Sequence, residues 1–334
     1  MPRDALLYVV ARESRFTAID RDALARRWPV RDWTARHPVR AALATARAVT
    51  GARAVVVWFA GWHAVVPVTV AWLLRRPSLV ITGGYDVTSV PEAGYGMRRN
   101  LAGRLASRWV LSRATVLMAN SESGRAETLS IVPRAAPRTL VVHHGIPDFP
   151  GEPGDGPRDG ALTVGVVDSP NLLRKGLLAF AAAAARLPEV PFVVAGPIAD
   201  PAAAQRLREA GDVELTGELS DAQLAERYRG AGTYVQASRH EGFGMSVAEA
   251  MLGGCVPVVS RAGALPEVVG DAGIVVDGDG PEALAAAIRT ALDASPEARR
   301  RARARVLEHF TLEQREAGLA AAVERALGRP DARR

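Results

Sequence analysis

The feature that most constrains this fold is a repeated alternation between short apolar runs and longer segments of helical pattern. Runs such as Leu6–Ala11 and Ala54–Phe59 are rich in Val and Leu, and mixed polar and apolar stretches separate them. Short runs without strict polar–apolar alternation are typical of strands that are buried on both faces. The alternation therefore predicts βαβ units built around parallel sheets.

The alternation is interrupted once, between residues 148 and 160. This stretch holds four glycines and three prolines, a density at which neither a helix nor a strand is expected. A chain of 334 residues is long enough for two domains. We predict an N-terminal Rossmann-like domain over 1–148, a linker over 149–160, a C-terminal Rossmann-like domain over 161–311, and a further helix over 312–328.

Composition excludes several classes of protein. The longest apolar stretch, Trp58–Leu74, contains His63 and Pro67 and is shorter than a membrane-spanning helix requires. The N-terminus lacks the pattern of a signal peptide, so we expect a cytoplasmic location. A single cysteine, Cys255, permits no intrachain disulfide, and no Cys/His cluster has the spacing of a zinc site.

The net charge of +6 favours an acidic partner. A nucleoside diphosphate, a nucleic acid and an anionic membrane each satisfy this sign, and so does a plain solvated surface. No nucleic-acid recognition motif is present, so we do not expect a nucleic-acid partner.

The most informative segment is Ser238–Met251, where a strand end leads through a glycine loop into a helix. Gly242 and Gly244 permit a close approach of a ligand to the backbone, and Ser246 is a favourable N-cap. The amides at such a helix start suit a phosphate group. Acids flank the loop at 241 and 249, where a carboxylate can accept hydrogen bonds from a ribose diol. Taken alone, the same arrangement also fits a structural turn whose second acid pairs with an arginine.

The run Glu241–Met251, with seven residues between its two glutamates, resembles the signature of glycosyltransferase family 4. The resemblance continues through Gly254–Val259, Ala262–Val269 and Gly273–Val276. It implies a GT-B fold, which is an α/β fold of two Rossmann-like domains with parallel sheets facing across a central cleft. It also implies that the last helix packs back on the N-terminal domain.

The family's donor-site roles transfer to matching positions of this chain. Glu241 would face the donor sugar and its phosphate, and Glu249 would bind the ribose. The loop residues that would hold the sugar and diphosphate, through their backbones and one hydroxyl, are Phe243, Gly244, Met245 and Ser246.

A second element, Gly165–Leu177, resembles the strand, loop and Lys-Gly helix start that open the donor domain in this family. Gly165 would then adjoin the donor, and Lys175 would be the cation on the leaving diphosphate. The family usually places an arginine just after that glycine, where this chain has two valines. Arg174 is the candidate replacement, although a solvated helix start is the alternative interpretation of the Arg174-Lys175 pair.

The resemblance implies a retaining hexosyltransferase that uses a UDP- or GDP-linked sugar and no other cofactor. A front-face retaining mechanism requires no general base. Cations of the donor site and the amides of a helix start would stabilise the departing diphosphate without a metal ion, so independence from metal is expected. The acceptor would be a glycan, a lipid-linked molecule or a small molecule. A degenerate GT-B protein that binds nucleotide sugar or glycan without turnover is the alternative.

The first domain is expected to bind the acceptor. Gly83–Val87 follows a strand at which many family members carry a catalytic histidine that contacts the donor sugar. Asp86 or Tyr85 would take that place here, unless the segment is an ordinary strand-to-helix turn.

One basic segment suggests a membrane contact. No acid occurs between residues 93 and 121, and with Leu101, Leu105 and Trp109 the segment forms an amphipathic pattern. It predicts peripheral association with an anionic membrane on the cytoplasmic face, a contact with a polyanionic acceptor, or a solvated face. The basic residues concerned are Arg98, Arg99, Arg104, Arg108 and Arg113.

Overall fold

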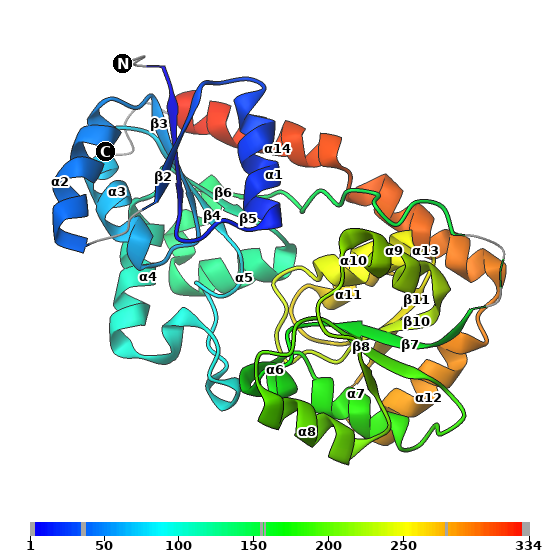
Figure 1. The fold of residues 1–334 in the computed structure, drawn as a ribbon. Helices are drawn as coiled ribbons and strands as arrows, with labels where there is room; N and C mark the ends of the chain where they lie inside the picture. Colours follow the sequence, from blue (N-terminus) through cyan, green and yellow to red (C-terminus); the bar gives the residue numbers. More distant parts are fainter. Residues whose placement is uncertain (1–3, 35–37, 154–155, 157, 278–279, 329–334) are drawn as a thin grey trace. The chain divides into compact units, whose positions relative to one another are not determined.

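The computed structural model describes residues 4–34, 38–153, 156, 158–277 and 280–328, and the chain forms two compact units. The first unit comprises Met1–Pro91, Gly96–Gly145 and Leu312–Arg334, and the second comprises Glu92–Tyr95 and Ile146–Thr311. Each unit contains one six-stranded sheet with helices on both of its faces (Figure 1).

The first sheet is parallel throughout and has the strand order β2-β1-β3-β4-β5-β6. Its inner strands are buried along their whole length, as the continuous apolar runs predict. The strands run Leu6–Val10 (β1), Val30–Thr34 (β2), Ala54–Trp58 (β3), Ser78–Thr82 (β4), Val116–Ala119 (β5) and Thr139–Val141 (β6).

Six α-helices accompany this sheet in the described residues. They are Arg15–Ala25 (α1), Pro38–Thr50 (α2), Trp62–Leu73 (α3), Leu101–Arg113 (α4), Glu122–Ile131 (α5) and Leu312–Gly328 (α14). Short 3₁₀ turns lie at Pro91–Ala93, Met97–Arg99 and Pro133–Arg138.

Helix α14 belongs to the first unit. It contacts α1 and the strands β3, β4 and β5, and its Leu319 and Val323 are buried in the same core cluster as Leu6 and Ile81. The C-terminal segment therefore completes the core of the unit in which the chain begins.

The second sheet is also parallel and has the strand order β12-β11-β10-β7-β8-β9. Its first strand begins at Asp159, within the stretch 149–160 that the sequence assigns to a linker. The strands run Asp159–Val164 (β7), Phe192–Ala195 (β8), Glu214–Leu215 (β9), Ala231–Gln236 (β10), Val256–Ser260 (β11) and Ile274–Val276 (β12).

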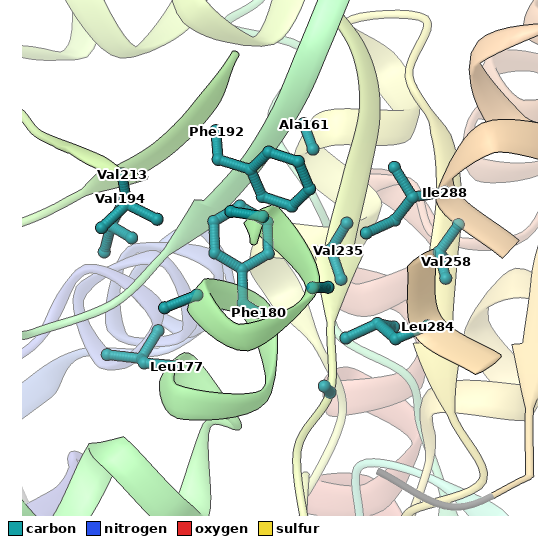
Figure 2. Close-up of a cluster of buried hydrophobic side chains, with 14 of the residues drawn as sticks. Ala161, Leu177, Phe180, Phe192, Val194, Val213, Val235, Val258, Leu284 and Ile288 are labelled. Atoms are coloured by element: carbon teal, nitrogen blue, oxygen red, sulfur yellow. The ribbon is translucent and has the colours of Figure 1, made fainter. Parts of the chain in front are cut away.

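The helices of this unit run Ser169–Arg174 (α6), Leu177–Ala184 (α7), Pro201–Ala210 (α8), Asp221–Gly230 (α9), Met245–Leu252 (α10), Leu265–Val269 (α11), Pro281–Leu292 (α12) and Pro296–His309 (α13). Helices α7 and α12 cover one face of the sheet, where the rings of Phe180 and Phe192 lie 4.9 Å apart among Val194, Val235 and Ile288 (Figure 2). Full burial of one such side chain contributes roughly 1.5–3 kcal/mol.

Candidate active site

The site lies where the second sheet changes its direction of winding. From β7 the chain winds outward through β8 and β9, and it then returns to place β10 against the other side of β7. Ligands of open α/β sheets bind at the carboxyl ends of the strands that flank such a point. Gly165 follows β7 here, and the loop that carries Glu241 follows β10.

Lys175 stands at the junction between α6 and α7. The sequence predicts a helix that starts at the Lys175-Gly176 pair. Helix α7 begins just after it, at Leu177, because Gly176 adopts a left-handed conformation (φ 71°), and the short helix α6 precedes the pair where a loop was expected. A Cβ atom at Gly176 would lie 2.0 Å from the carbonyl oxygen of Ala237, so the junction packs directly against the end of β10. The Arg239 amide also donates to the Arg174 carbonyl at 2.9 Å.

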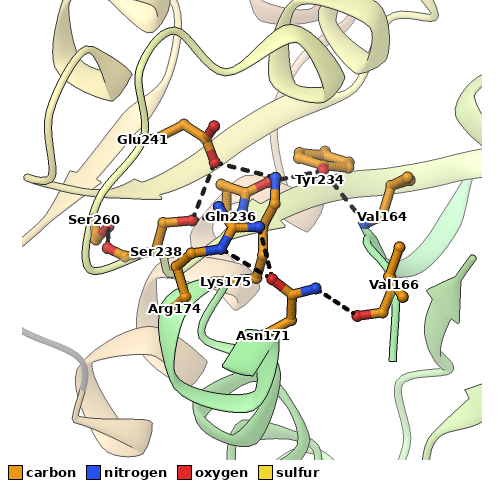
Figure 3. A network of polar contacts seen from close by, with 10 residues as sticks. All are labelled: Val164, Val166, Asn171, Arg174, Lys175, Tyr234, Gln236, Ser238, Glu241 and Ser260. Atoms are coloured by element: carbon orange, nitrogen blue, oxygen red, sulfur yellow. Dashed lines mark hydrogen bonds and ion pairs between the residues drawn. The ribbon is translucent and has the colours of Figure 1, made fainter. Parts of the chain in front are cut away.

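This packing brings Lys175 and Glu241 together. The Nζ atom of Lys175 donates to Oε2 of Glu241 at 3.1 Å, and both side chains are about five-sixths buried (Figure 3). Burial by itself would raise the pKa of the Glu241 carboxyl, but the positive charges of Lys175 and Arg174 outweigh it and leave the pKa below its ordinary value. The carboxylate is therefore ionised at neutral pH.

Arg174 is held close to this pair by Asn171. Its Nε and Nη2 atoms donate to Oδ1 of Asn171 at 2.9 and 2.6 Å, and the Asn171 amide in turn donates to the Val166 carbonyl at 3.0 Å. Val167 is fully buried in the core. The family usually has an arginine on the loop after β7. In this chain the Arg174 guanidinium comes from α6 instead, and Asn171 links it to that loop.

A buried polar chain supports Glu241 from behind (Figure 3). The Val164 amide donates to the Tyr234 hydroxyl at 3.3 Å, so this hydroxyl gives its own proton to Oε1 of Gln236 at 3.0 Å. The Gln236 amide group then donates to Oγ of Ser238 at 2.7 Å, and Oγ donates to Oε2 of Glu241 at 3.4 Å. Each donor in this series of hydrogen bonds points toward the Glu241 carboxylate.

The loop backbone is held as closely as the side chain. A Cβ atom at Gly263 would lie 2.2 Å from the Glu241 carbonyl oxygen, and the Ala264 amide donates to that oxygen at 3.0 Å. Glycine at 263 is therefore required by this approach of two loops.

Helix α10 begins at Met245 and not at Ser246, so Ser246 lies in the first turn and is not the N-cap that the sequence favours. The N-cap is Gly244, in a left-handed conformation (φ 103°), and no side chain caps this helix. The amides of a first helical turn have no partner within the helix, and they carry its positive end. The Phe243 side chain packs edge-to-face on Phe310 in the core, so any contact of this residue with a donor is left to its backbone.

Glu249 is buried inside α10 and has a hydroxyl partner. The Tyr228 hydroxyl donates to its Oε2 atom at 3.1 Å. Burial and the neighbouring carboxylate both raise the pKa of Tyr228, so the phenol keeps its proton and remains a donor. Tyr228 lies within α9, and nothing in the local sequence distinguishes it as a site residue.

Asp86 lies in the first unit, in the loop after β4, and is fully buried. Its two carboxylate oxygens accept from the amides of Ala60 at 2.7 Å and Gly83 at 3.1 Å. Burial raises the pKa of Asp86 to about 6 against the effect of these hydrogen bonds. The carboxylate thus ties together the loops after β3 and β4, and its expected contact with the donor sugar stays a prediction.

Comparison with known proteins identifies the fold and the second unit. Residues 159–294 match the family model described as Glycosyl transferases group 1. Among solved structures, sucrose-phosphate synthase from Thermosynechococcus elongatus superposes with a TM-score of 0.76 at 18% identity, covering 96% of this chain and 98% of that one. Anabaena HepE in complex with UDP superposes with a TM-score of 0.79 at 16% identity, covering 96% of this chain and 99% of that one.

The chain has the GT-B fold, and its residues 159–294 are similar to Glycosyl transferases group 1. The GT-B architecture predicted from the sequence is thereby confirmed, and the matches are compatible with the resemblance to glycosyltransferase family 4.

Curated relatives of this GT-B protein match over shorter segments. O-antigen chain mannosyltransferase B of Escherichia coli is 42% identical over 82 residues, which are 25% of this chain and 22% of the relative. MMP alpha-(1->4)-mannosyltransferase of Mycolicibacterium hassiacum is 38% identical over 124 residues, 35% of this chain and 30% of the relative. A GDP-mannose-dependent phosphatidylinositol dimannoside mannosyltransferase of Mycobacterium tuberculosis is 34% identical over 111 residues, 33% of this chain and 29% of the relative. The chain thus spans less than a third of the length of each.

The described residues contain neither a membrane-spanning helix nor a cluster of metal ligands. None of the helices there is long and apolar enough to cross a membrane. Within those residues, no group of three or more His, Cys, Asp and Glu side chains is arranged to hold a metal ion.

Proposed function

We propose that this protein transfers a hexosyl unit from a nucleoside-diphosphate sugar to an acceptor hydroxyl and retains the anomeric configuration. The observation that carries the proposal is the Lys175–Glu241 pair at the switch point of the second sheet, beside the uncapped start of α10. The names of the curated mannosyltransferases make GDP-mannose the first donor to test, with UDP sugars next.

In this proposal the cations of the chain stabilise the departing diphosphate. Lys175 and Arg174 lie together on one side of Glu241, and the first amides of α10 supply the positive end of a helix. Fixed positive charges that face a leaving group lower the barrier because they require no reorganisation during the reaction. Lysine, arginine and helix amides can neutralise the diphosphate charge that a metal ion neutralises in other enzymes. We therefore propose that transfer is independent of metal and of any further cofactor.

The two glutamates have separate roles. Glu241 is ionised and faces Lys175. Its carboxylate would accept hydrogen bonds from the hydroxyls of the donor sugar and would also orient the lysine. Glu249 would accept hydrogen bonds from the ribose diol, with the Tyr228 hydroxyl fixing the carboxylate. Gly165 would leave room for the donor, since a Cβ atom there meets nothing nearer than 3.8 Å in the protein.

Calorimetric titration with GDP, UDP, ADP and their common sugars, in the presence of a chelator, tests the donor site. One nucleotide should bind, and Glu249→Gln should weaken it by about tenfold to a hundredfold, since hydrogen bonds to charged groups contribute about 1.5–3 kcal/mol. Lys175→Met should lower turnover by about 10²- to 10³-fold, as loss of one such stabilising group does.

Glu226→Gln, on the exposed side of α9, is the matched control and should change neither quantity. If Glu249→Gln binds the nucleotide as tightly as the original chain, the ribose contact is elsewhere. If no nucleotide binds at millimolar concentration, the proposed function is wrong.

A second candidate function is donor binding without transfer. The observation that favours it is the pair Val166-Val167 in place of the family's arginine. Nucleotide binding in the titration, with no release of GDP or UDP from any sugar donor over a range of acceptors, would support this candidate against the first.

We also propose that α4 forms a peripheral contact with an anionic membrane. Leu101, Leu105 and Trp109 follow one another at intervals of four residues and are 70%, 60% and 40% exposed. Arg104 and Arg108 lie beside this stripe and are also exposed. An exposed apolar row flanked by cations matches the boundary of an anionic bilayer.

A further inference from the structure

The first unit contains a cavity of about 620 Å³. Ala11 after β1, Phe59 after β3 and Asp86 after β4 line it, so it lies at the carboxyl ends of three strands. Strand β1 pairs with β2 on one side and with β3 on the other, which makes this the switch point of the first sheet. The cavity has the location and the size of a small-molecule site.

One wall of the cavity is built from a strained residue. Phe59 has a φ of 68°, a left-handed conformation that is rare for a bulky side chain. The fold enforces it, because the Phe59 amide donates to the Ile81 carbonyl at 2.8 Å and the ring packs at 5.4 Å from Trp58. A Cβ atom at Gly83 would lie 2.1 Å from the Phe59 ring, so glycine at 83 makes room for it. Strain that the surroundings impose at a pocket wall is typical of functional sites.

A second apolar part of the lining comes from another element. It comes from the first turns of α3, where Trp62 is 60% exposed and is followed by Val66 and Pro67. An exposed indole that lines an apolar cavity presents a flat apolar face on which a ligand can pack.

Polar side chains also line this space, namely Thr45, His63, Tyr85, Asp86, Arg99 and Asn100. The Asp86 oxygens are engaged by the amides of Ala60 and Gly83. His63 donates from Nε2 to the Trp58 carbonyl at 2.6 Å, and burial lowers its pKa, so its ring is neutral and Nδ1 carries a lone pair. A hydroxyl donor is the partner that this nitrogen can accept.

We propose that this cavity is the acceptor site and that the acceptor carries an apolar aglycone, aryl or alkyl. The aglycone packs between Phe59 and Trp62, and a hydroxyl of the acceptor donates to Nδ1 of His63. That the ligand is an acceptor rests on the proposed function. That the ligand is apolar rests on the cavity alone.

Calorimetry without donor tests the chemistry directly, with methyl, octyl and 4-nitrophenyl α-mannosides and α-glucosides as the probes, below their micellar concentrations. At least one apolar glycoside should bind about tenfold or more tightly than the methyl glycoside, because its aglycone is removed from water. Binding of the octyl glycoside above the aryl one indicates a lipid-like aglycone, and the reverse order indicates an aromatic one. Equal affinity of methyl and apolar glycosides overturns the inference.

Variants locate the binding. Phe59→Gly removes the ring at a position whose left-handed backbone suits glycine, and it should cost about tenfold in affinity for the apolar glycosides only. Val66→Trp fills the cavity and should abolish their binding. Leu73→Ala, at the exposed end of the same helix, is the control and should leave it unchanged. Apolar glycosides that still bind Val66→Trp occupy another place, and the inference is then wrong.

The outcome is separable from that of the donor titration. If a nucleotide binds the second unit and no glycoside binds the first, this inference fails alone. If apolar glycosides bind the cavity and no nucleotide binds, the proposed function fails while the ligand chemistry of the cavity stands.

Discussion

At the scale of single residues, the site depends on how Glu241 is kept ionised and oriented. Two of its neighbours are cations, and the third contact is a hydroxyl whose direction is set by a chain of buried hydrogen bonds through Gln236 and Tyr234. A hydrogen bond donated to a carboxylate stabilises its charged form and lowers its pKa. Ser238 therefore acts on Glu241 even though it need not touch the donor.

Ser238→Ala should raise the pKa of Glu241. The pKa of this carboxyl lies below its ordinary value in the folded chain, so the ionised form is lost only as the pH falls through that low value. Removing one donor moves the loss to higher pH, and the acid limb of kcat/KM should shift upward by a few tenths of a pH unit or more. The measurement is the pH profile of sugar transfer.

Ser260→Ala is the matched control, since its hydroxyl is also buried but donates at 2.5 Å to the Ser238 carbonyl and not to the carboxylate. It should lower stability without moving the acid limb. An identical shift in both variants would show that Ser238 acts only through packing.

The sequence predicted some of these residues and missed others for a physical reason. Lys175 and Glu241 each lie in a motif with local spacing, so the sequence alone suggests their roles. Tyr228 carries no such signal, because a buried polar side chain is recognised by its partner, and its partner Glu249 lies on another element. Gln236 carries none either, because its sequence position is that of an ordinary strand end and only its burial makes its hydrogen bonds matter. The engagement of Asp86 by backbone amides is invisible for the same reason.

At the scale of elements, burial decides what the sequence reveals. Inner strands such as β3 read as continuous apolar runs and were predicted within one residue of their bounds. Strand β2 was missed because it lies at the sheet edge and carries Arg31 and Asp32, as edge strands often carry charge. Helix α1 begins at Arg15, where Ser14 and Thr17 form a capping box.

Helix α4 provides the prediction that belongs to this scale. The intact protein should co-sediment with vesicles that contain anionic lipid, less so with neutral ones, and high salt should weaken the binding. Leu105→Gln combined with Arg108→Gln should reduce the bound fraction severalfold, because each basic residue near such a surface contributes about 1 kcal/mol. Leu43→Gln, which alters an equally exposed leucine on α2, should have no effect. Equal binding by all three proteins would contradict the membrane contact.

At the scale of the whole molecule, the chain returns at its end to the unit in which it starts. The two series of βαβ units were visible in the sequence, because each repeats the same alternation on either side of a glycine- and proline-rich stretch. The residues that attach α14 to the first unit were not, because they lie 295 positions apart. The two residues pair because both are charged and buried, and no local sequence pattern reveals that burial.

That attachment is a buried ion pair between Arg315 and Asp20. Their side chains are 1% and 2% exposed, and Nη2 of Arg315 lies 2.6 Å from Oδ2 of Asp20. The same guanidinium donates to Oδ1 of Asn120 at 3.1 Å and to the Val142 carbonyl at 2.6 Å. The arginine thus joins α14 both to α1 and to the loops after β5 and β6.

Asp20→Asn should destabilise the first unit by about 3–5 kcal/mol, because it leaves a buried guanidinium without a counter-charge. Replacing both partners, Asp20→Leu with Arg315→Met, should cost less than the single change, since apolar residues of similar volume remove both desolvation penalties. Glu324→Gln on α14, which breaks an exposed 3.8 Å pair with Arg27 just beyond the end of α1, should cost no more than about 1 kcal/mol. All six tryptophans lie in the first unit, so urea unfolding followed by tryptophan fluorescence reports on that unit directly. A double variant less stable than Asp20→Asn would mean that the ion pair itself, and not the uncompensated charge, determines the stability of the unit.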